Sequence, residues 1–294
     1  MVKLHVTVQA NAKLNLTLDI IGKRPDGFHS LTSIMQSVDL HDIVVISTDR
    51  SGKIGISCDN TDLPLNEDNT AYKAAALYLS SIGQKAGVNI RIDKRIPVSA
   101  GLAGGSADAA AVLLGLNEIF GRILDNEKLA ELGAKVGADL PFCLIGGTAL
   151  AEGIGDILTP IKSLPACCFV IVKPCKKMST AFMYSKYDMT HINRRPDTKS
   201  AVKTIQSGDI YEFSKHIYNV FEAAWDDQAI QNAKNALLNQ GALAASLTGS
   251  GPCVFGLFAC EADAKKCCEY LKNLYSEVYV CKPTNFGCKI IEVE

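Results

Sequence analysis

The feature that most constrains this 294-residue chain is a glycine-rich stretch that runs directly into alanines, residues 97–114 (PVSAGLAGGSADAAAVLL). Gly101, Gly104 and Gly105 allow backbone angles and close approaches that a Cβ atom would forbid. Ser106 is a natural first-turn residue for the helix that we expect to follow. Because free N–H groups and the helix dipole at such an end attract anions, the segment predicts a phosphate cradle. The spacing fits neither a Walker A loop nor a dinucleotide-binding G-x-G-x-x-G, and an ordinary flexible loop before a helix remains the alternative.

A second glycine-rich segment, residues 246–255 (SLTGSGPCVF), lies between two apolar runs. Its central residues, Thr248 to Gly251, could donate N–H and hydroxyl groups to phosphate oxygens. The same residues would also suit a plain hairpin bend. This segment alone therefore leaves both interpretations open.

Two charged side chains stand in settings that suggest chemistry. Residues 12–16 (AKLNL) alternate like a strand, which puts Lys13 and Asn15 on one face. Asp139 follows the end of a predicted helix, within an otherwise apolar GADLP segment. Each also has a plain structural explanation. Lys13 would be a solvated surface lysine, and Asp139 would accept a hydrogen bond within a local turn.

Strand patterns and helix patterns are mixed along the chain, which predicts an α+β protein. At this length two domains are expected. A new series of strand and helix patterns begins after Pro160, and it divides the chain into residues 1–160 and 161–294. Period-two alternation and short apolar runs predict strands at 4–8, 14–20, 43–46, 54–56, 88–92, 168–173 and 277–280. Helices are predicted at 71–79 with Asn69 as cap, 126–136, 179–187, 199–206, 209–221, 227–239 and 262–274.

Composition excludes some classes of function. Lys and Arg number 30 against 31 Asp and Glu, and this balance argues against a nucleic-acid-binding protein. The eleven cysteines are odd in number and contain no C-x-x-C pair, so we expect reduced core thiols in a cytoplasmic protein. The first residues lack the apolar core of a secretion signal, and no apolar run approaches the ~18 residues of a membrane span.

Taken together, four segments resemble the GHMP kinase superfamily: residues 12–16, 97–110, 137–141 and 247–254. Four more, RPDGFH (24–29), NEDN (66–69), DKRIP (93–97) and EGIGDILTP (152–160), resemble the branch that acts on 4-diphosphocytidyl-2-C-methyl-D-erythritol. The resemblance runs nearly end to end. It implies the two-domain GHMP kinase fold, with a ribosomal-protein-like, ATP-binding β/α domain (1–160) and a C-terminal α/β sandwich domain on the substrate side (161–294).

The resemblance also implies roles for individual residues. Asp139 would accept the proton of the substrate hydroxyl while Lys13 orients that group and stabilises developing charge. The implied nucleotide-binding residues are Asn69, Lys94, Pro97, Ser99, Ala100, Gly101, Leu102, Ala103, Gly104, Gly105, Ser106, Ala107, Thr248, Gly249, Ser250 and Gly251. The implied substrate-binding residues are Asn15, Phe28, His29 and Tyr184, with His29 bonded to the cytosine and the aromatic rings stacked on it.

The implied reaction is ATP-dependent phosphorylation of the 2-hydroxyl of this cytidyl diphosphate, in non-mevalonate isoprenoid synthesis, by a monomer or weak homodimer. Mg²⁺ would be held by nucleotide phosphates, Ser106 and water, with no side chain assigned as its direct ligand. Asp108, in the helix after the loop, is the acidic side chain that could instead help to hold it. The alternatives are a GHMP kinase with another acceptor, such as homoserine or mevalonate, a nucleotide-binding sensor without turnover, and an RNA-binding module.

Overall fold

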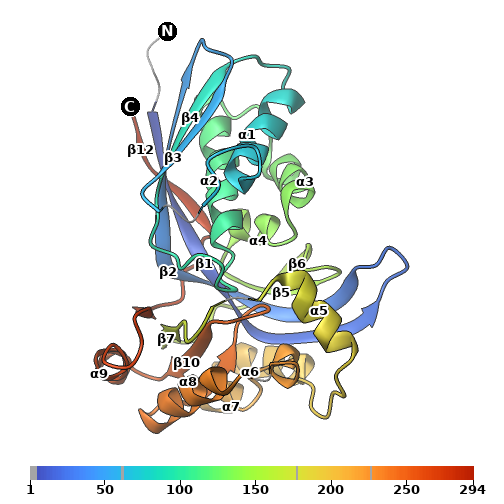
Figure 1. The fold of residues 1–294 in the computed structure, drawn as a ribbon, viewed down its shortest axis with the longest axis vertical. Helices are drawn as coiled ribbons and strands as arrows, with labels where there is room; N and C mark the ends of the chain where they lie inside the picture. The colour runs from blue at the N-terminus through green and yellow to red at the C-terminus, as the bar shows by residue number, and fades with distance from the viewer. Residues whose placement is uncertain (1–4, 61–62, 177, 226) are drawn as a thin grey trace.

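The computed structural model describes residues 5–60, 63–176, 178–225 and 227–294 (Figure 1). Its larger sheet has the order β12–β1–β2–β4–β3; β5 joins it beside β2, β6 beside β5, and β8 beside β1. These strands are β1 (His5–Lys23), β2 (His29–Asp49), β3 (Ile54–Cys58), β4 (Gly87–Asp93), β5 (Thr148–Glu152), β6 (Ile157–Pro160), β8 (Tyr218–Asn219) and β12 (Cys288–Val293). The start of the strand predicted at 4–8 lies outside the described residues.

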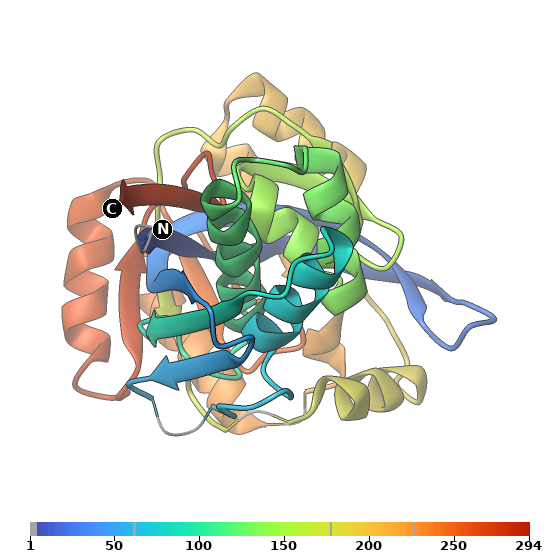
Figure 2. The ribbon, with the colours of Figure 1, turned by 90° about the horizontal axis from the view of Figure 1, so that it is seen from above.

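Strands β1 and β2 form one long hairpin whose end projects from the body of the molecule (Figure 2). We predicted two separate strands over the β1 region. The structure shows one continuous strand instead, because residues 9–13 pair with β2 on one side and partly with β12 on the other. Register shifts next to Lys13, Asn15 and Gly22 bend this strand, and such bulges re-aim side chains. Every residue from Ala10 to Ile20 is buried, so both faces of the strand are covered.

Four helices pack together against the upper part of this sheet: α1 (Thr70–Ser81), α2 (Gly104–Ile119), α3 (Asn126–Val136) and α4 (Leu140–Ile145) (Figures 1 and 2). Helix α2 contributes the alanine-rich run, and Ala107, Ala110 and Ala111 are fully buried. Their small side chains let the helix approach the sheet closely. Asn69 caps α1 as predicted, since its Oδ1 accepts a hydrogen bond from the N–H of Ala71.

The smaller sheet has the order β11–β7–β10–β9 and forms a separate apolar core with helices α8 and α9. Its strands are β7 (Cys168–Val172), β9 (Ala244–Leu247), β10 (Val254–Phe258) and β11 (Val278–Cys281). The helices of this part are α5 (Thr180–Asp188), α6 (Thr198–Ser207), α7 (Ile210–Ser214), the 3₁₀ helix η1 (Val220–Ala223), α8 (Gln228–Asn239) and α9 (Glu261–Leu271).

The mixed helix and strand content confirms the α+β class. The helix predicted at 209–221 is wrong in its second half, where β8 and η1 stand instead. Asn219 causes the break: its side chain caps η1 and donates to the carbonyl oxygens of Leu247 and Gly249. The smaller sheet begins after residue 160, but β8 and β12 rejoin the larger sheet, and the domain boundary at 160 stays a prediction.

Eight of the eleven cysteines are buried, which agrees with their prediction as core residues. Burial also raises the pKa of several of their thiols, Cys167 to about 12 for example. Among the described residues, no helix combines the length and apolar character that a membrane crossing requires.

Candidate active site

Most of the predicted site residues line one cavity of about 810 Å³. These are Lys13, Asn15, Phe28, His29, Lys94, Pro97, Ser99, Ala100, Gly101, Ala103, Gly104, Gly105, Ser106, Asp139, Tyr184, Gly249 and Ser250. They come from β1, the end of the β1–β2 hairpin, the two glycine-rich loops, the start of α4 and helix α5. Segments far apart in the sequence thus meet around a volume typical of a small-molecule site.

The two glycine-rich loops face each other backbone to backbone. A Cβ atom on Gly101 would lie 2.2 Å from the carbonyl oxygen of Thr248, and the φ angle of Gly101 is +78°. The Thr248 hydroxyl also donates to the carbonyl oxygen of Gly101, at 3.3 Å. Only glycine fits such a contact, so the pairing of the loops explains why Gly101 is needed.

Helix α2 begins at the cavity with free donors. Its N-cap residue, Ala103, has a left-handed conformation and no side chain that could bond to the first turn. The first N–H groups of α2 therefore have no capping side chain, while Gly104, Gly105 and Ser106 line the cavity. Together with the helix dipole, this is the arrangement that binds phosphate.

Lys13 and Asp139 meet in the cavity, with the lysine Nζ 3.6 Å from Oδ1 of the aspartate. The Lys13 side chain is almost fully buried, whereas that of Asp139 is 36% exposed. Asp139 occupies the N-cap position of α4 but makes no capping bond, so its carboxylate stays free for the cavity. The pair lies beside the α2 end and combines a cation with a possible proton acceptor.

Asn15 holds the lysine and one loop in place. Its Oδ1 accepts hydrogen bonds from Lys13 Nζ at 2.6 Å and from the N–H of Gly249 at 3.0 Å. Its Nδ2 donates to the Ser33 hydroxyl, and its backbone N–H donates to Thr248. Asn15 lines the cavity, but both polar atoms of its side chain are already bonded to the protein.

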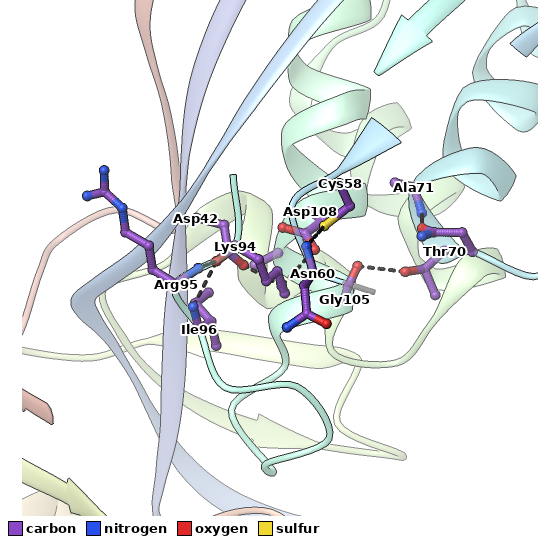
Figure 3. Close-up of polar contacts among 12 residues, drawn as sticks. Asp42, Cys58, Asn60, Thr70, Ala71, Lys94, Arg95, Ile96, Gly105 and Asp108 are labelled. Atoms are coloured by element: carbon purple, nitrogen blue, oxygen red, sulfur yellow. Dashed lines mark hydrogen bonds and ion pairs between the residues drawn. The ribbon is translucent and has the colours of Figure 1, made fainter. Parts of the chain in front are cut away.

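Lys94 lies close to Asp42 and Asp108, between these two buried carboxylates (Figure 3). Its Nζ is paired with Asp42 of β2 and lies 2.8 Å from Oδ2 of Asp108. Burial opposes the charge on Lys94, but the nearby Asp108 and Asp42 outweigh it and raise the pKa of this lysine. A Cβ atom on Gly104 would lie 3.0 Å from this Nζ, so the cluster supports the loop directly.

Asp108 is turned away from the cavity. Burial raises the pKa of its carboxyl to about 8, although Lys94 beside it acts in the opposite direction. Its Oδ1 is buried and has no hydrogen-bond partner among the described residues. Asp108 is therefore placed to pair with Lys94 and not to hold a metal at the loop. Elsewhere in the described residues, histidine, cysteine and acidic side chains form no group of three suited to a metal ion.

The far end of the cavity is aromatic. The rings of His29 and Tyr184 lie against each other, tilted by 30°, with centroids 4.8 Å apart. The Phe28 side chain, from the residue next to His29, is 60% exposed. Burial raises the pKa of Tyr184 to about 12, so this phenol stays neutral. The hairpin end thus offers flat apolar faces and one imidazole, which suits a heterocyclic ring.

Comparisons with known proteins agree with this geometry. Residues 69–147 match the family model of the GHMP kinases N-terminal domain, and residues 201–277 match that of the GHMP kinases C-terminal domain. A 4-diphosphocytidyl-2-C-methyl-D-erythritol kinase of Caldicellulosiruptor saccharolyticus is 45% identical over 273 residues, which are 92% of this chain and 94% of that protein.

The chain belongs to the GHMP kinase family. A crystal structure of 4-(cytidine 5'-diphospho)-2C-methyl-D-erythritol kinase matches this GHMP kinase with a TM-score of 0.80 at 29% identity, covering 94% of this chain and 98% of that one. Homoserine kinase from Cytophaga hutchinsonii has a TM-score of 0.76 at 23% identity, over 98% of this chain and 97% of that one, a likeness that shows the fold alone.

Five predicted nucleotide-binding residues of this GHMP kinase lie outside the cavity lining: Asn69, Leu102, Ala107, Thr248 and Gly251. Asn69 uses its side chain to cap α1 and to bond the Pro64 carbonyl oxygen. Leu102, Ala107 and Thr248 are buried. Gly251 lies against the Trp225 ring, where a Cβ atom would be 2.8 Å from Nε1. Their roles in binding stay predictions.

The structure also adds residues that the sequence analysis missed in this kinase. Lys23, Thr180 and Asp188 line the cavity, while Asp42 forms an ion pair with Lys94. Asp188 lies four residues after Tyr184, so the helical period of α5 could have pointed to it. Asp42 carried no such signal, because its partner Lys94 is 52 residues away.

Proposed function

We propose that this GHMP kinase transfers the terminal phosphoryl group of ATP to the 2-hydroxyl of 4-diphosphocytidyl-2-C-methyl-D-erythritol. The Lys13–Asp139 pair carries this proposal, since it lies in one cavity with a phosphate-type helix end and an aromatic end. The products would be ADP and the 2-phosphate, an intermediate of non-mevalonate isoprenoid synthesis. The names of the curated relatives and of the first structural neighbour support this substrate.

The reaction needs alignment and charge compensation more than covalent help from the protein. The carboxylate of Asp139 accepts the proton of the 2-hydroxyl as that oxygen bonds to the γ-phosphorus. The bond from this phosphorus to the β–γ bridging oxygen breaks, and ADP leaves. The Lys13 ammonium lies beside the reacting oxygens and offsets their negative charge, and the free N–H groups of α2 hold the phosphates.

The chain offers few side chains for Mg²⁺, whose preferred ligands are oxygens. Ser106 and Asp139 present oxygen atoms at the cavity, whereas Asp108 is paired with Lys94. We therefore infer that Mg²⁺ is held mainly by the nucleotide phosphates, Ser106 and water, where it would neutralise phosphate charge.

We further infer that the protein acts in the cytoplasm as a monomer or weak homodimer, without nucleic acid or membrane. A formal net charge of −1 supports the absence of nucleic-acid binding. RNA binding that weakens with salt would contradict this part of the proposal.

A coupled assay of ADP release tests the activity. The cytidyl substrate, homoserine and mevalonate are compared with a reaction that contains no acceptor. We expect ADP release that depends on the cytidyl substrate alone. Turnover with homoserine or mevalonate would assign another GHMP activity, and ATP binding without acceptor-dependent ADP release would indicate a nucleotide sensor.

A further inference from the structure

The carboxylate of Asp188 joins helix α5 to the end of the β1–β2 hairpin. Its Oδ1 lies 2.6 Å from Nε2 of His29, and its Oδ2 lies 2.6 Å from Nζ of Lys23. Lys23 and His29 are cross-strand partners at the end of the hairpin, so one carboxylate binds both strands. Hydrogen bonds from Lys23 and then His29 lower the pKa of Asp188, which stays ionised.

Helix α5 holds the His29 ring from two directions. Asp188 is the last residue of this helix, and Tyr184 stands one turn earlier on the same face. Tyr184 covers the flat side of the imidazole, while Asp188 binds its edge. With two such contacts the ring, which is only 9% exposed, has a fixed orientation.

An ionised carboxylate only accepts hydrogen bonds, so Nε2, which faces it, is the ring nitrogen that carries a proton. In a ring with a single proton, the other nitrogen, Nδ1, is an acceptor. Among the described residues Nδ1 has no hydrogen-bond partner, and it does not belong to the buried polar atoms that lack one. Because His29 lines the cavity, Nδ1 is the polar atom that the ring offers to a ligand there.

We propose that Asp188 is a positioning residue that makes the site select cytosine over uracil, by holding the His29 proton on Nε2. This inference rests on the proposed function. Cytosine carries an amino group, a donor, at the ring position where uracil carries an acceptor oxygen. If Nδ1 is an acceptor, it can accept a hydrogen bond from the amino group of cytosine. It cannot form a hydrogen bond with the uracil oxygen, which is also an acceptor. A site built in this way rejects the analogue that lacks the matching group.

The test compares kcat/KM for the cytidyl substrate and for its uridine analogue in the wild type and in Asp188→Asn. An amide can accept from Nε2–H or donate to Nε2, so both tautomers of His29 become accessible. We expect the cytidine-to-uridine ratio to fall about 10- to 100-fold. Glu131→Gln is the matched control, since it makes the same acid-to-amide change in an exposed ion pair with Lys128, outside the cavity, and should keep the ratio. An unchanged ratio in Asp188→Asn would overturn the proposal.

A second measurement needs no turnover. The ¹⁵N spectrum of the ligand-free protein, with His29 assigned by comparison with His29→Gln, should show protonated Nε2 in the wild type and mixed tautomers in Asp188→Asn. Protonated Nδ1 in the wild type would contradict the role of Asp188. Failure of the wild type to phosphorylate the cytidyl substrate would instead disprove the proposed function, and the spectrum would still test the tautomer.

Discussion

At the scale of single residues, the site depends on which carboxylates stay free. Asp139 stands at a helix N-cap yet makes no capping bond, and this leaves its oxygens to the cavity. Asp108 also lies near the phosphate-type loop, but it is buried and paired with Lys94. Two aspartates close to one helix end therefore have different chemistry, because one is accessible and the other is held by a buried cation.

Replacement of either Lys13 or Asp139 should abolish most of the turnover. We expect Asp139→Asn and Lys13→Ala to lower kcat by about 10²- to 10⁴-fold, because a proton acceptor or a compensating charge is lost. Nucleotide affinity, measured by calorimetry, should be largely kept, since the loop donors are unchanged. Glu131→Gln, in an exposed ion pair on α3, is the control and should retain the wild-type rate. A near-normal rate in either site variant would contradict the assigned pair.

Asp108 should make the stability of the fold depend on pH. Its pKa is about 8 in the folded protein against 3.8 for the free group, so the folded state holds one more proton between these values. The contribution of Asp108 to the free energy of unfolding then falls as pH rises from about 4 to 8, by at most about 1.4 kcal/mol per unit. Asp108→Asn removes this titration, and the variant should gain stability relative to the wild type as pH rises. Urea unfolding of both proteins at several pH values measures this difference in stability. If the free energies of unfolding of the two proteins changed in parallel with pH, the raised pKa of Asp108 would be disproved.

At the scale of elements, the two glycine-rich loops work as one unit. Neither loop has a regular structure of its own where they touch, and each one limits the backbone of the other. Gly101 and Gly249 lie at this contact, where a Cβ atom on Gly249 would be 2.9 Å from the Gly101 carbonyl oxygen. The contact brings the loop before α2 and the loop between β9 and β10 to the same cavity.

Gly101→Ala should therefore affect binding and folding together. The new methyl group meets a carbonyl oxygen at 2.2 Å, at a φ angle of +78° that is unfavourable for alanine. We expect the free energy of unfolding to fall by about 2 kcal/mol or more and the KM for ATP to rise. Gly22→Ala is the control, because a Cβ atom there has no neighbour within 4 Å and the φ angle is ordinary. Equal effects of the two substitutions, by denaturation and steady-state kinetics, would rule out the loop contact as the cause.

At the scale of the whole molecule, the chain crosses between its two sheets more than once. Strands β7, β9, β10 and β11 build the smaller sheet, but β12 returns to pair with β1 in the larger one. The N–H of His5 also donates to the carbonyl oxygen of Glu294, so the start of β1 lies beside the end of β12. This connection couples the unfolding of the two parts.

We expect a single cooperative unfolding transition for this reason. The one tryptophan, Trp225, donates to the Ser250 carbonyl oxygen in the second glycine-rich loop, and its fluorescence reports that region. Circular dichroism reports helices and strands of the whole chain. The two signals should give the same midpoint in urea. A chain that ends at residue 287, without β12, should have a lower midpoint by both probes, and separate midpoints in the full chain would contradict the coupling.

The sequence by itself determined much of the local structure. Some sequence signals depend only on near neighbours in the chain: the glycines before the alanine run, the cap at Asn69 and the strand alternation around Lys13. They indicate the backbone angles at a residue and the face of the helix or strand to which its side chain points. These signals were enough to predict the α+β class, the α1 cap and most helices. They failed at 209–221, where Asn219 bonds to a strand that follows much later in the chain.

Only the tertiary structure decided which side chains meet. Lys13 and Asp139 are 126 residues apart and lie on elements that are connected only through the fold. The pairing of Lys94 with Asp42 and Asp108, and of Asp188 with His29, likewise depends on how elements pack. A sequence pattern shows what a side chain can donate or accept, but burial and distance decide which partner it has, and these arise when the chain folds.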